Sequence, residues 1–431
     1  MKIKIVNFEK AIFILFIASI VLNYSTYFTW DSYGNVFIKY AIKSFRYFGL
    51  LIMFLYLMTK RNGLNLRKLN SKLFLLTCIL IFNIIEMNLL GASHFHFFYL
   101  GPIVILSTFI ICLSLSVVKR SNLYEYFMKL FVLVTLPSVI YYLLVYVVGI
   151  NLPYTVLGSD HMGKVAGGLF YQLRPLGIIA DSVFNIVPRL CGIFDEPGVV
   201  GTFCAFFISI NLLCNINRKW TCLLFLEGVA SLSFAFYILL FLLVLIVAFN
   251  KGAVKFLTLM LVFLASLMIF VNAEFTNPQL TALQKRIDFT SNILIVDNRT
   301  STTFDKAFDE FISKGGYPLI FGEGIGAYND NPNMTGSNSY KCLIYDYGIV
   351  GFVLYVGFFV LLYIIEYGIN RYNLPFFILF MASLYQRAYI LDQMYLALYI
   401  CGLAYITLNK DMAMFSNKII VKDNGDKYAS C

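Results

Sequence analysis

Arg189, Asp195 and Glu196 stand together where a polar segment of the chain gives way to an apolar one. Pro197 and Gly198 directly follow the two acids and begin a long run of apolar residues. A guanidinium group binds phosphate oxygens in a two-pronged geometry, and a carboxylate can accept a proton as a general base. Charged residues are costly to place in so apolar a chain, so this cluster predicts half of an active site at a membrane surface.

The two acids also have a structural interpretation. Acids that precede Pro197 are typical of a helix N-cap and first turn, so Glu196 is either a base or a capping residue. The helix that begins there would present unpaired N–H groups and partial positive charge to an anion held by Arg189. The sequence leaves both interpretations of Glu196 open and predicts a phosphate contact for Arg189.

The polar segment before this cluster holds two further candidates for substrate binding. His161 could act as a base because histidine titrates near neutral pH, although a lone histidine in a loop is more often simply solvated. Arg174 supplies a second guanidinium group on the same segment.

A second polar segment, much later in the chain, contains a predicted amphipathic helix. Apolar residues between Phe304 and Phe311 have helical spacing, so Thr302 or Thr303 is expected to cap a helix that lies along the membrane. Lys314 and the two glycines after it should end this helix. A later Gly-Glu-Gly-Ile-Gly run lacks the Lys-Ser/Thr pair of a phosphate-binding loop, so its glycines are expected to form a tight turn.

The composition predicts an all-α, polytopic integral membrane protein. Of 431 residues, 60% are hydrophobic and 13% are charged, and the mean hydropathy is +0.78. A soluble domain has about 25% charged residues. The net charge of +10 does not indicate a nucleic-acid partner, because the basic residues are scattered between apolar runs.

A spanning helix needs about 20 apolar residues. Twelve stretches are candidates: 11–29, 38–59, 73–91, 98–118, 128–149, 197–215, 220–234, 235–250, 254–272, 345–366, 374–389 and 392–409. The run 220–250 is either one tilted span or two short ones, and Ser231 and Ser233 mark the expected turn between two.

The distribution of basic residues predicts the orientation. The short loop 60–72 carries Lys and Arg and no acid, which is typical of the cytoplasmic side. Both termini are then cytoplasmic, and a single membrane domain, 1–431, carries two large extracytoplasmic loops, 150–196 and 273–344. The tail after Asn409 is expected to be disordered.

Several charged residues fall inside predicted spans. Lys39, Lys43 and Arg46 share one helical face, where they could hold a lipid phosphate or reach water from an interfacial helix. Glu86 and Glu227 are isolated carboxylates, which are usually functional or paired but could lie protonated near an interface.

Other kinds of chemistry find no support in the sequence. Zinc-type cysteine spacing, a serine nucleophile elbow and a dinucleotide fingerprint are absent, so we expect neither a metal nor a cofactor. A disulfide between Cys191 and Cys342 is an open alternative, because sequence does not show distance. Arginines can meet the negative charge of a leaving group without a metal ion. This suits a reaction whose leaving group is an activated phosphate ester.

Together these features resemble a known family, the O-antigen polymerase (Wzy) and O-antigen ligase superfamily of bacterial surface polysaccharide assembly. Arg189 with GIFDEPGVVGT (Gly192–Thr202) resembles the end of the first large periplasmic loop of Wzy polymerases. Three further features resemble the second large loop of these polymerases. They are Arg299 before an amphipathic helix, PLIFGEGIG (Pro318–Gly326) and SNSYKCLIYDYGIVG (Ser337–Gly351).

The resemblance implies a glycosyl transfer between two lipid-linked oligosaccharides. The growing glycan would leave undecaprenyl diphosphate and join the non-reducing end of a new repeat unit. Arg189 and Arg299 would hold the diphosphate. Glu196, or as second choice Asp297, would take the proton of the attacking hydroxyl.

The resemblance also implies which residues contact the substrate and where in the cell the protein acts. Asp195, Asn338 and Tyr340 lie in the matched motifs and would contact the substrate, with Lys43 and Arg46 at a lipid phosphate. The protein would act at the periplasmic face of the bacterial inner membrane, and a chain-length regulator protein is a conceivable partner.

One departure separates members of the superfamily. Ligases carry a histidine where Ser337 stands here, which argues against a ligase and against a histidine base at this position. The alternatives are an O-antigen ligase, a capsule or exopolysaccharide polymerase, and a lipid-linked oligosaccharide flippase. A flippase should have short loops and charge deep in many helices, unlike this chain.

Overall fold

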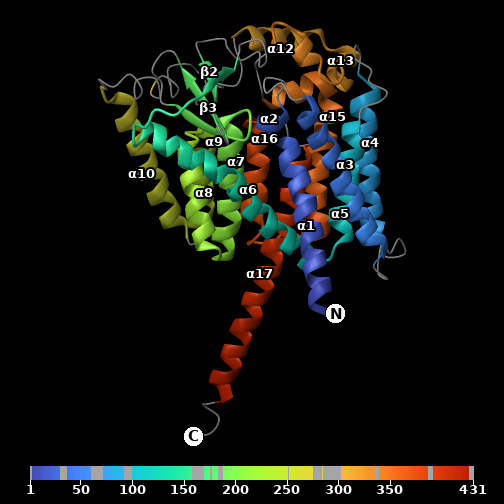
Figure 1. Ribbon diagram of the computed structural model, residues 1–431, viewed down its shortest axis with the longest axis vertical. Helices are drawn as coiled ribbons and strands as arrows, with labels where there is room; N and C mark the ends of the chain where they lie inside the picture. The colour runs from blue at the N-terminus through green and yellow to red at the C-terminus, as the bar shows by residue number, and fades with distance from the viewer. Residues whose placement is uncertain are drawn as a thin grey trace.

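The computed structural model shows a bundle of helices with a small sheet at one end (Figure 1). The residues that it describes are 2–29, 36–59, 71–91, 100–157, 169–174, 177–182, 188–250, 252–274, 284, 302–334, 339–386 and 392–426.

A helix lies in each of the twelve predicted apolar stretches. These helices are α1 (Lys2–Tyr24), α3 (Val36–Thr59), α4 (Ser71–Leu89), α5 (Leu100–Ser114), α6 (Val117–Tyr146), α7 (Pro197–Cys214), α8 (Arg218–Ala230), α9 (Phe234–Asn250), α10 (Ala253–Asn272), α15 (Tyr340–Leu362), α16 (Leu374–Gln386) and α17 (Gln393–Asp426). Shorter elements are α2 (Thr26–Thr29), α12 (Thr302–Lys314), α13 (Gly316–Phe321), α14 (Ala327–Asp330) and the π-helical turn η4 (Tyr363–Tyr367).

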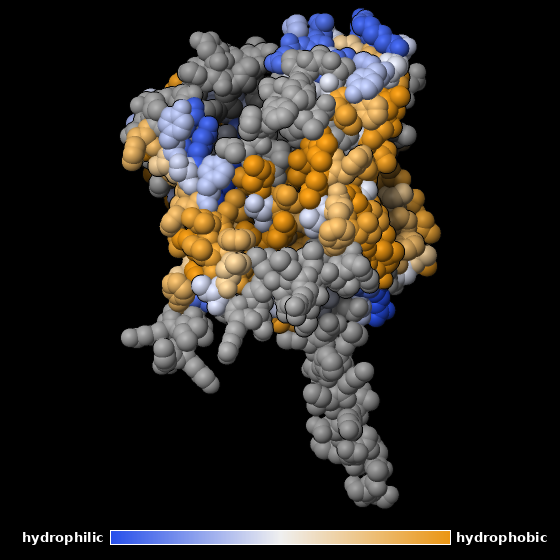
Figure 2. Space-filling view, turned by 90° about the vertical axis from the view of Figure 1, so that its right-hand side faces the viewer, coloured by the Kyte–Doolittle hydropathy of each residue, from blue (hydrophilic) through white to orange (hydrophobic). Residues whose placement is uncertain are grey.

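The surface of the bundle is that of a helical membrane protein. Five of the described helices are long and apolar enough to cross a membrane. Figure 2 shows a belt of hydrophobic residues around the middle of one face, with hydrophilic residues above and below it. On α10, Leu261 and Ile269 are 66% and 72% exposed, which suits contact with lipid.

The run 220–250, for which the sequence left one span or two open, forms two helices with a turn at Ser231 and Ser233. Leu232 has a φ of 45°, a conformation that ends α8, and the Ser231 hydroxyl donates to the Gly228 carbonyl at 2.6 Å. The turn between α8 and α9 packs tightly against α7, because a Cβ on Gly201 of α7 would lie 2.4 Å from the Cβ of Ser233.

The first polar segment contains a sheet that the all-α prediction missed. Strands β1 (Thr155–Leu157), β2 (Leu169–Arg174), β3 (Gly177–Ser182) and β4 (Arg189–Gly192) form a four-stranded antiparallel sheet in the order β1-β2-β3-β4.

Both faces of this sheet are covered by protein. Leu173, Ile178 and Cys191 pack together with Tyr27. Ile179 and Leu190 pack on the other side, against apolar residues of α6 and α8. Strands covered on both faces lack a clear alternation of polar and apolar residues, which explains why the sequence did not reveal them.

The elements of both polar segments gather at one end of the bundle, which we call the sheet end. Figure 1 shows the sheet, α12 and α13 at this end, with the N- and C-termini at the opposite end. The sheet end therefore holds the residues from which a site could be assembled.

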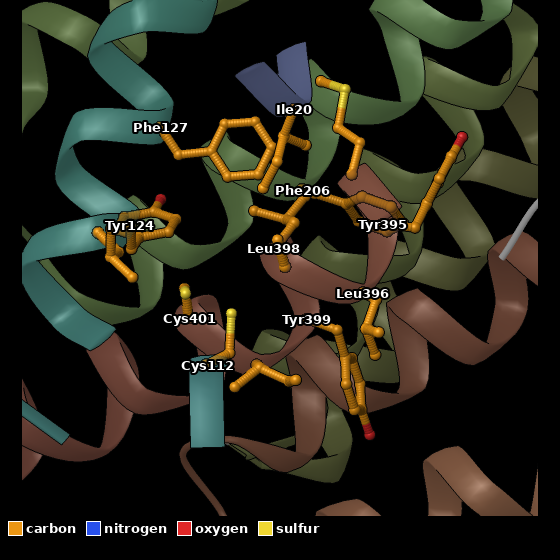
Figure 3. Packing of buried hydrophobic residues seen from close by; sticks show 14 of the residues in the cluster. Ile20, Cys112, Tyr124, Phe127, Phe206, Tyr395, Leu396, Leu398, Tyr399 and Cys401 are labelled. Atoms are coloured by element: carbon orange, nitrogen blue, oxygen red, sulfur yellow. The ribbon is translucent and has the colours of Figure 1, made fainter. Parts of the chain in front are cut away.

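Helix α17 is the centre of the core. Residues 393–406 are buried without interruption. Figure 3 shows its side chains packed against Tyr124 and Phe127 of α6, Phe206 of α7 and Ile20 of α1.

The chain after Asn409 was expected to be disordered, and this was wrong. Helix α17 continues to Asp426. The sequence has neither glycine nor proline between Asn409 and Gly425, so nothing in it breaks the helix earlier.

A buried arginine fastens the bundle near the start of α6. Arg120 is 5% exposed and pairs with Glu366 at 2.5 Å, while its other nitrogens donate to the Leu113 and Leu115 carbonyls at 2.9 Å. The Tyr367 hydroxyl donates to a carbonyl of α17 at 2.8 Å. A buried ion pair requires such additional hydrogen bonds, and here they join α5, α6, η4 and α17.

Two glycines hold the second polar segment against a kink in α15. Gly322 (φ 81°, ψ 171°) and Gly348 (φ 66°, ψ −176°) occupy a backbone region that only glycine adopts readily. Their backbones touch, because a Cβ on Gly322 would lie 2.1 Å from the Asp346 carbonyl oxygen. The Asp346 carboxylate accepts from the Gly326 and Tyr328 amides at 3.0 and 2.9 Å. The predicted tight turn is confirmed, and these residues have a structural role.

We expect Gly348→Ala to destabilise the protein by roughly 2–4 kcal/mol, because it adds backbone strain and a clash with α13. Its Cβ would lie 2.3 Å from the Ile320 carbonyl oxygen. Gly357→Ala on the same helix is the matched control, since its Cβ would meet nothing within 4 Å. Thermal unfolding in detergent measures the difference, and equal stability of both variants would contradict this account of the joint.

Candidate functional site

The segment that carries Arg189, Asp195 and Glu196 is fixed at several points. The Tyr142 hydroxyl of α6 donates to the Pro188 carbonyl at 2.8 Å. The Ile193 carbonyl accepts from the Ser25 hydroxyl at 2.9 Å and from the Tyr27 amide at 3.0 Å. Backbone held in this way presents its side chains in a constant geometry, which a catalytic site needs.

The side chains of this segment fall into two groups that differ in burial. Leu190, Cys191 and Phe194 are 0% exposed, and the Phe194 ring stacks on Phe131 at 5.7 Å. The three charged residues are half-buried instead. Gly192 (φ 63°) turns the chain between strand and helix in a conformation that favours glycine.

The three charged residues of the segment all affect the pKa of one thiol, that of Cys191. Burial raises the pKa of Cys191 well above its usual range; the Arg189 guanidinium lowers it, and Asp195 and Glu196 raise it. All three predicted site residues are therefore close enough to act on the same sulfur atom. A buried thiol with a raised pKa is not a nucleophile, so Cys191 is an anchor.

The alternative of a disulfide is not borne out. Neither Cys191 nor Cys342 forms a disulfide. Each is buried in a different apolar cluster, the first beneath the sheet with Tyr171 and the second beneath α12 with Phe304.

Glu196 occupies the position that both interpretations predicted. It is the N-cap residue of α7 in extended conformation, with Pro197 in the first turn, but its side chain forms no capping hydrogen bond. The N-terminus of α7 thus lies directly beside Arg189 and the two acids. Its N–H groups and partial positive charge add to a setting for an anion.

Arg174 is part of the sheet's own framework. It is 4% exposed and donates to the Gln172 side-chain oxygen at 2.9 and 2.5 Å and to the Leu152 carbonyl at 2.8 Å. Gln172 in turn donates to Asp181 at 2.6 Å. The guanidinium carbon lies 4.6 Å from the centre of the Tyr154 ring, with the rings of two further tyrosines within 6 Å. These contacts explain the residue without a substrate, and its substrate contact stays a prediction.

A helix lies at the predicted place, α12, and ends at Lys314 as expected, but Thr302, one of the two expected caps, is its first helical residue. Its apolar face is not turned to lipid, because Phe304, Phe308 and Phe311 are at most 8% exposed and pack against Met334 and Cys342. An ion pair between Lys341 and Asp305 at 2.7 Å also fastens α12 to the start of α15.

Four predicted site residues, His161, Asp297, Arg299 and Asn338, lie outside the described residues. The apposition of Arg189 and Arg299 therefore stays a prediction. Tyr340 is described and stacks on Tyr385 of α16 at 5.4 Å.

The basic stripe on α3 does not act as one surface. Lys43 is exposed, whereas Arg46 is half-buried and interacts with Asp392 at the start of α17. A lipid phosphate could therefore meet Lys43 at the surface, whereas an Arg46 nitrogen donates to the exposed Tyr47 hydroxyl at 3.2 Å. The carboxyl of Asp392 was not recognised in the sequence, although an acid directly before a helix is a typical cap.

Glu227 is fully buried between α6, α7 and α8. Its Oε2 atom accepts from the Cys204 thiol at 3.9 Å, and its Oε1 atom has no hydrogen-bond partner. No ion pair within the described part of the chain includes it. The side chain of Glu86 is outside the described set.

The described residues contain no group of three or more His, Cys, Asp or Glu side chains that could hold a metal ion. The charged groups at the start of α7 can bind an anion and accept a proton. Sequence reasoning found them because a proline and a carboxylate pair mark the helix start.

We expect Arg174→Lys to lower the free energy of unfolding by roughly 1.5–3 kcal/mol, because lysine keeps the charge but not the forked hydrogen bonds. Thermal unfolding in detergent measures this loss, with Arg371→Lys as control, since Arg371 is exposed and donates to the neighbouring Tyr372 hydroxyl at 2.7 Å. Unchanged stability together with lost activity would instead favour a direct substrate contact.

Comparison with protein families, curated proteins and solved structures finds no match to this chain.

Proposed function

We propose that the chain is a polysaccharide polymerase of the O-antigen type, which joins repeat units carried on undecaprenyl diphosphate. The observation that carries the proposal is the cluster of Arg189, Asp195 and Glu196 at the N-terminus of α7, on an anchored segment at the sheet end of an apolar bundle. The Arg189 guanidinium and the N-terminus of α7 suit an anionic headgroup, and the apolar bundle suits a lipid tail.

The arrangement of the bundle supports a lipid-linked substrate. The apolar belt in Figure 2 would lie in the inner membrane, with the sheet end facing the periplasm. The polyprenyl tail would lie against the helices, and the diphosphate would meet Arg189 where the apolar surface ends. Arg299, before α12, would supply the second guanidinium group.

The proposed reaction is a substitution at an anomeric carbon. A hydroxyl oxygen at the non-reducing end of the new repeat unit forms a bond to that carbon, and the bond from the carbon to the diphosphate oxygen breaks. Glu196, with Asp297 as second choice, takes the hydroxyl proton. Arg189 and Arg299 stabilise the negative charge that develops on undecaprenyl diphosphate as it leaves.

Glu196 meets one requirement of such a base. It is half-buried rather than enclosed, so a hydroxyl group can approach it.

Transfer to a finished acceptor, as in a ligase, and polymerisation of a capsule would use the same groups. Ser337 in place of the ligase histidine favours polymerisation. A flippase is disfavoured because it should have short loops, whereas this chain has two long polar segments, 150–196 and 273–344.

We expect Arg189→Ala, and separately Arg299→Ala, to abolish long polysaccharide chains while the protein still inserts in the membrane. Each variant removes a cation that stabilises the leaving diphosphate, an effect of about 2.7–4 kcal/mol for one such donor. Gel electrophoresis of the surface polysaccharide measures the chain-length distribution, and an epitope tag measures insertion.

Arg371→Ala is the matched control for both variants, because Arg371 is an exposed arginine in the turn before α16. It should leave the chain length unchanged. Normal chain length in both Arg189→Ala and Arg299→Ala would remove the proposed site.

We also expect polymerisation by the purified protein to proceed in excess chelator, because arginines rather than a metal would meet the diphosphate charge. Reconstituted protein supplied with the lipid-linked repeat unit tests this. Activity that is lost in chelator and restored by magnesium or manganese would show that the proposed charge balance is wrong.

A further inference from the structure

Helix α13 carries apolar side chains on the outside of the second polar segment. Tyr317 and Ile320 are three positions apart, on one face of the helix, and are 50% and 46% exposed. The Phe321 ring lies beside that of Tyr317, with 4.9 Å between the ring centres. Exposed apolar side chains that lie together are typical of a surface that contacts a membrane or another protein.

The neighbouring helix α12 has a different outer surface. Its phenylalanine face is buried, and its exposed residues include Lys306, Asp309, Glu310 and Ser313. Ile312 is 41% exposed among these polar residues. A helix with such an outer surface suits contact with water, so the membrane contact that the sequence predicted for α12 is better placed on α13.

Two contacts fix α13 at the boundary between the apolar bundle and the sheet end. The Tyr317 hydroxyl donates at 2.8 Å to the carbonyl of Leu90, which lies at the end of the predicted span 73–91. The backbone of Ile320 touches the kink in α15, since a Cβ on Gly348 would lie 2.3 Å from the Ile320 carbonyl oxygen. Figure 1 shows α13 at the sheet end over α15.

The exposed apolar surface of α13 continues onto α15. Ile349, which follows Gly348 at the contact with α13, is 47% exposed, and Val353, one turn further along, is 60% exposed. Helix α15 is among the helices that are long and apolar enough to cross a membrane. Because α13 extends the surface of a spanning helix, the occupant that fits both is lipid.

The backbone that follows α13 is paired in a way that suits this position. The Glu323 amide donates to the Tyr345 carbonyl at 2.9 Å. The Gly324 amide donates to the Asp346 carbonyl at the same distance. Backbone that is not helical is tolerated at membrane depth only where protein satisfies its polar groups. The kink in α15 provides the carbonyls that meet this requirement for the turn after α13.

We propose that α13 lies in the headgroup region of the bilayer leaflet at the sheet end, with Tyr317 and Ile320 in contact with lipid acyl chains. Tyrosine is enriched at this boundary because its ring is apolar and its hydroxyl needs a polar partner. Here the Leu90 carbonyl is that partner. The contact holds the second polar segment at the level of the lipid headgroups, with α12 above it in water. This inference does not depend on the proposed function.

Ile320→Trp tests the proposal, because tryptophan fluorescence reports the surroundings of an exposed position. The background is the full chain with Trp30→Phe and Trp220→Phe, which removes both native tryptophans. The protein is placed in nanodiscs of phosphatidylcholine with brominated acyl chains, since bromine quenches tryptophan on contact. We expect Ile320→Trp to lose most of its emission in brominated lipid, compared with ordinary lipid, and to lose little of it to iodide in the buffer.

Two matched variants in the same background define the extremes. Ile312→Trp replaces an isoleucine of similar exposure on α12, and it should be quenched by iodide but not by brominated lipid. Val353→Trp on α15 should show the opposite pattern. Tyr317→Trp carries the same expectation as Ile320→Trp, so the result does not depend on one substitution. Thermal unfolding shows that each variant is folded.

Two outcomes would overturn the proposal. Quenching of Ile320→Trp and Tyr317→Trp by iodide and not by brominated lipid would show that α13 faces water. Protection of both variants from both quenchers would show that protein, from this chain or a second copy, covers α13. Neither measurement involves a substrate, so failure of polymerisation would leave this inference standing.

Discussion

The burial of α17 from its first residue is the constraint on which the rest of the structure depends. A helix that begins inside an apolar bundle leaves N–H groups that neither lipid nor water can satisfy. Asp392 provides one partner by accepting from the Met394 amide at 2.6 Å. Further along, Tyr367 and Arg120 bind the helix to η4 and α6. Polar groups are thus confined to defined positions in an otherwise apolar core, and each position needs a structural or functional explanation.

The sheet end meets the same constraint in another way. The strands tie a long connection between α6 and α7 into one unit, and the Arg174–Gln172–Asp181 network holds its charges together. This leaves the short segment after β4 anchored by its apolar residues while its charged side chains stay half-buried. An anchored backbone that carries half-buried charges at the end of a helix is a setting in which electrostatic stabilisation of a leaving group is effective, because the charges need not reorganise during the reaction.

How far the sequence predicts this structure depends on the range of the interactions involved. Local patterns succeeded in part. The spacing of the phenylalanines predicted α12, and Ser231 and Ser233 lie at the turn between α8 and α9, where the sequence left one span or two open. The sheet was missed because its strands are short and covered on both faces. The continuation of α17 to Asp426 was misjudged because polarity was taken as a sign of disorder in a tail without helix breakers.

The most direct test of the central claim is the surface polysaccharide of a strain from which this gene alone has been deleted. A polymerase joins repeat units but does not attach them to their final acceptor. The account predicts that the deletion strain carries a single repeat unit on the lipid core, with longer chains restored by the wild-type gene. A core without any repeat unit would indicate a ligase, and a normal distribution of chain lengths would contradict the account altogether.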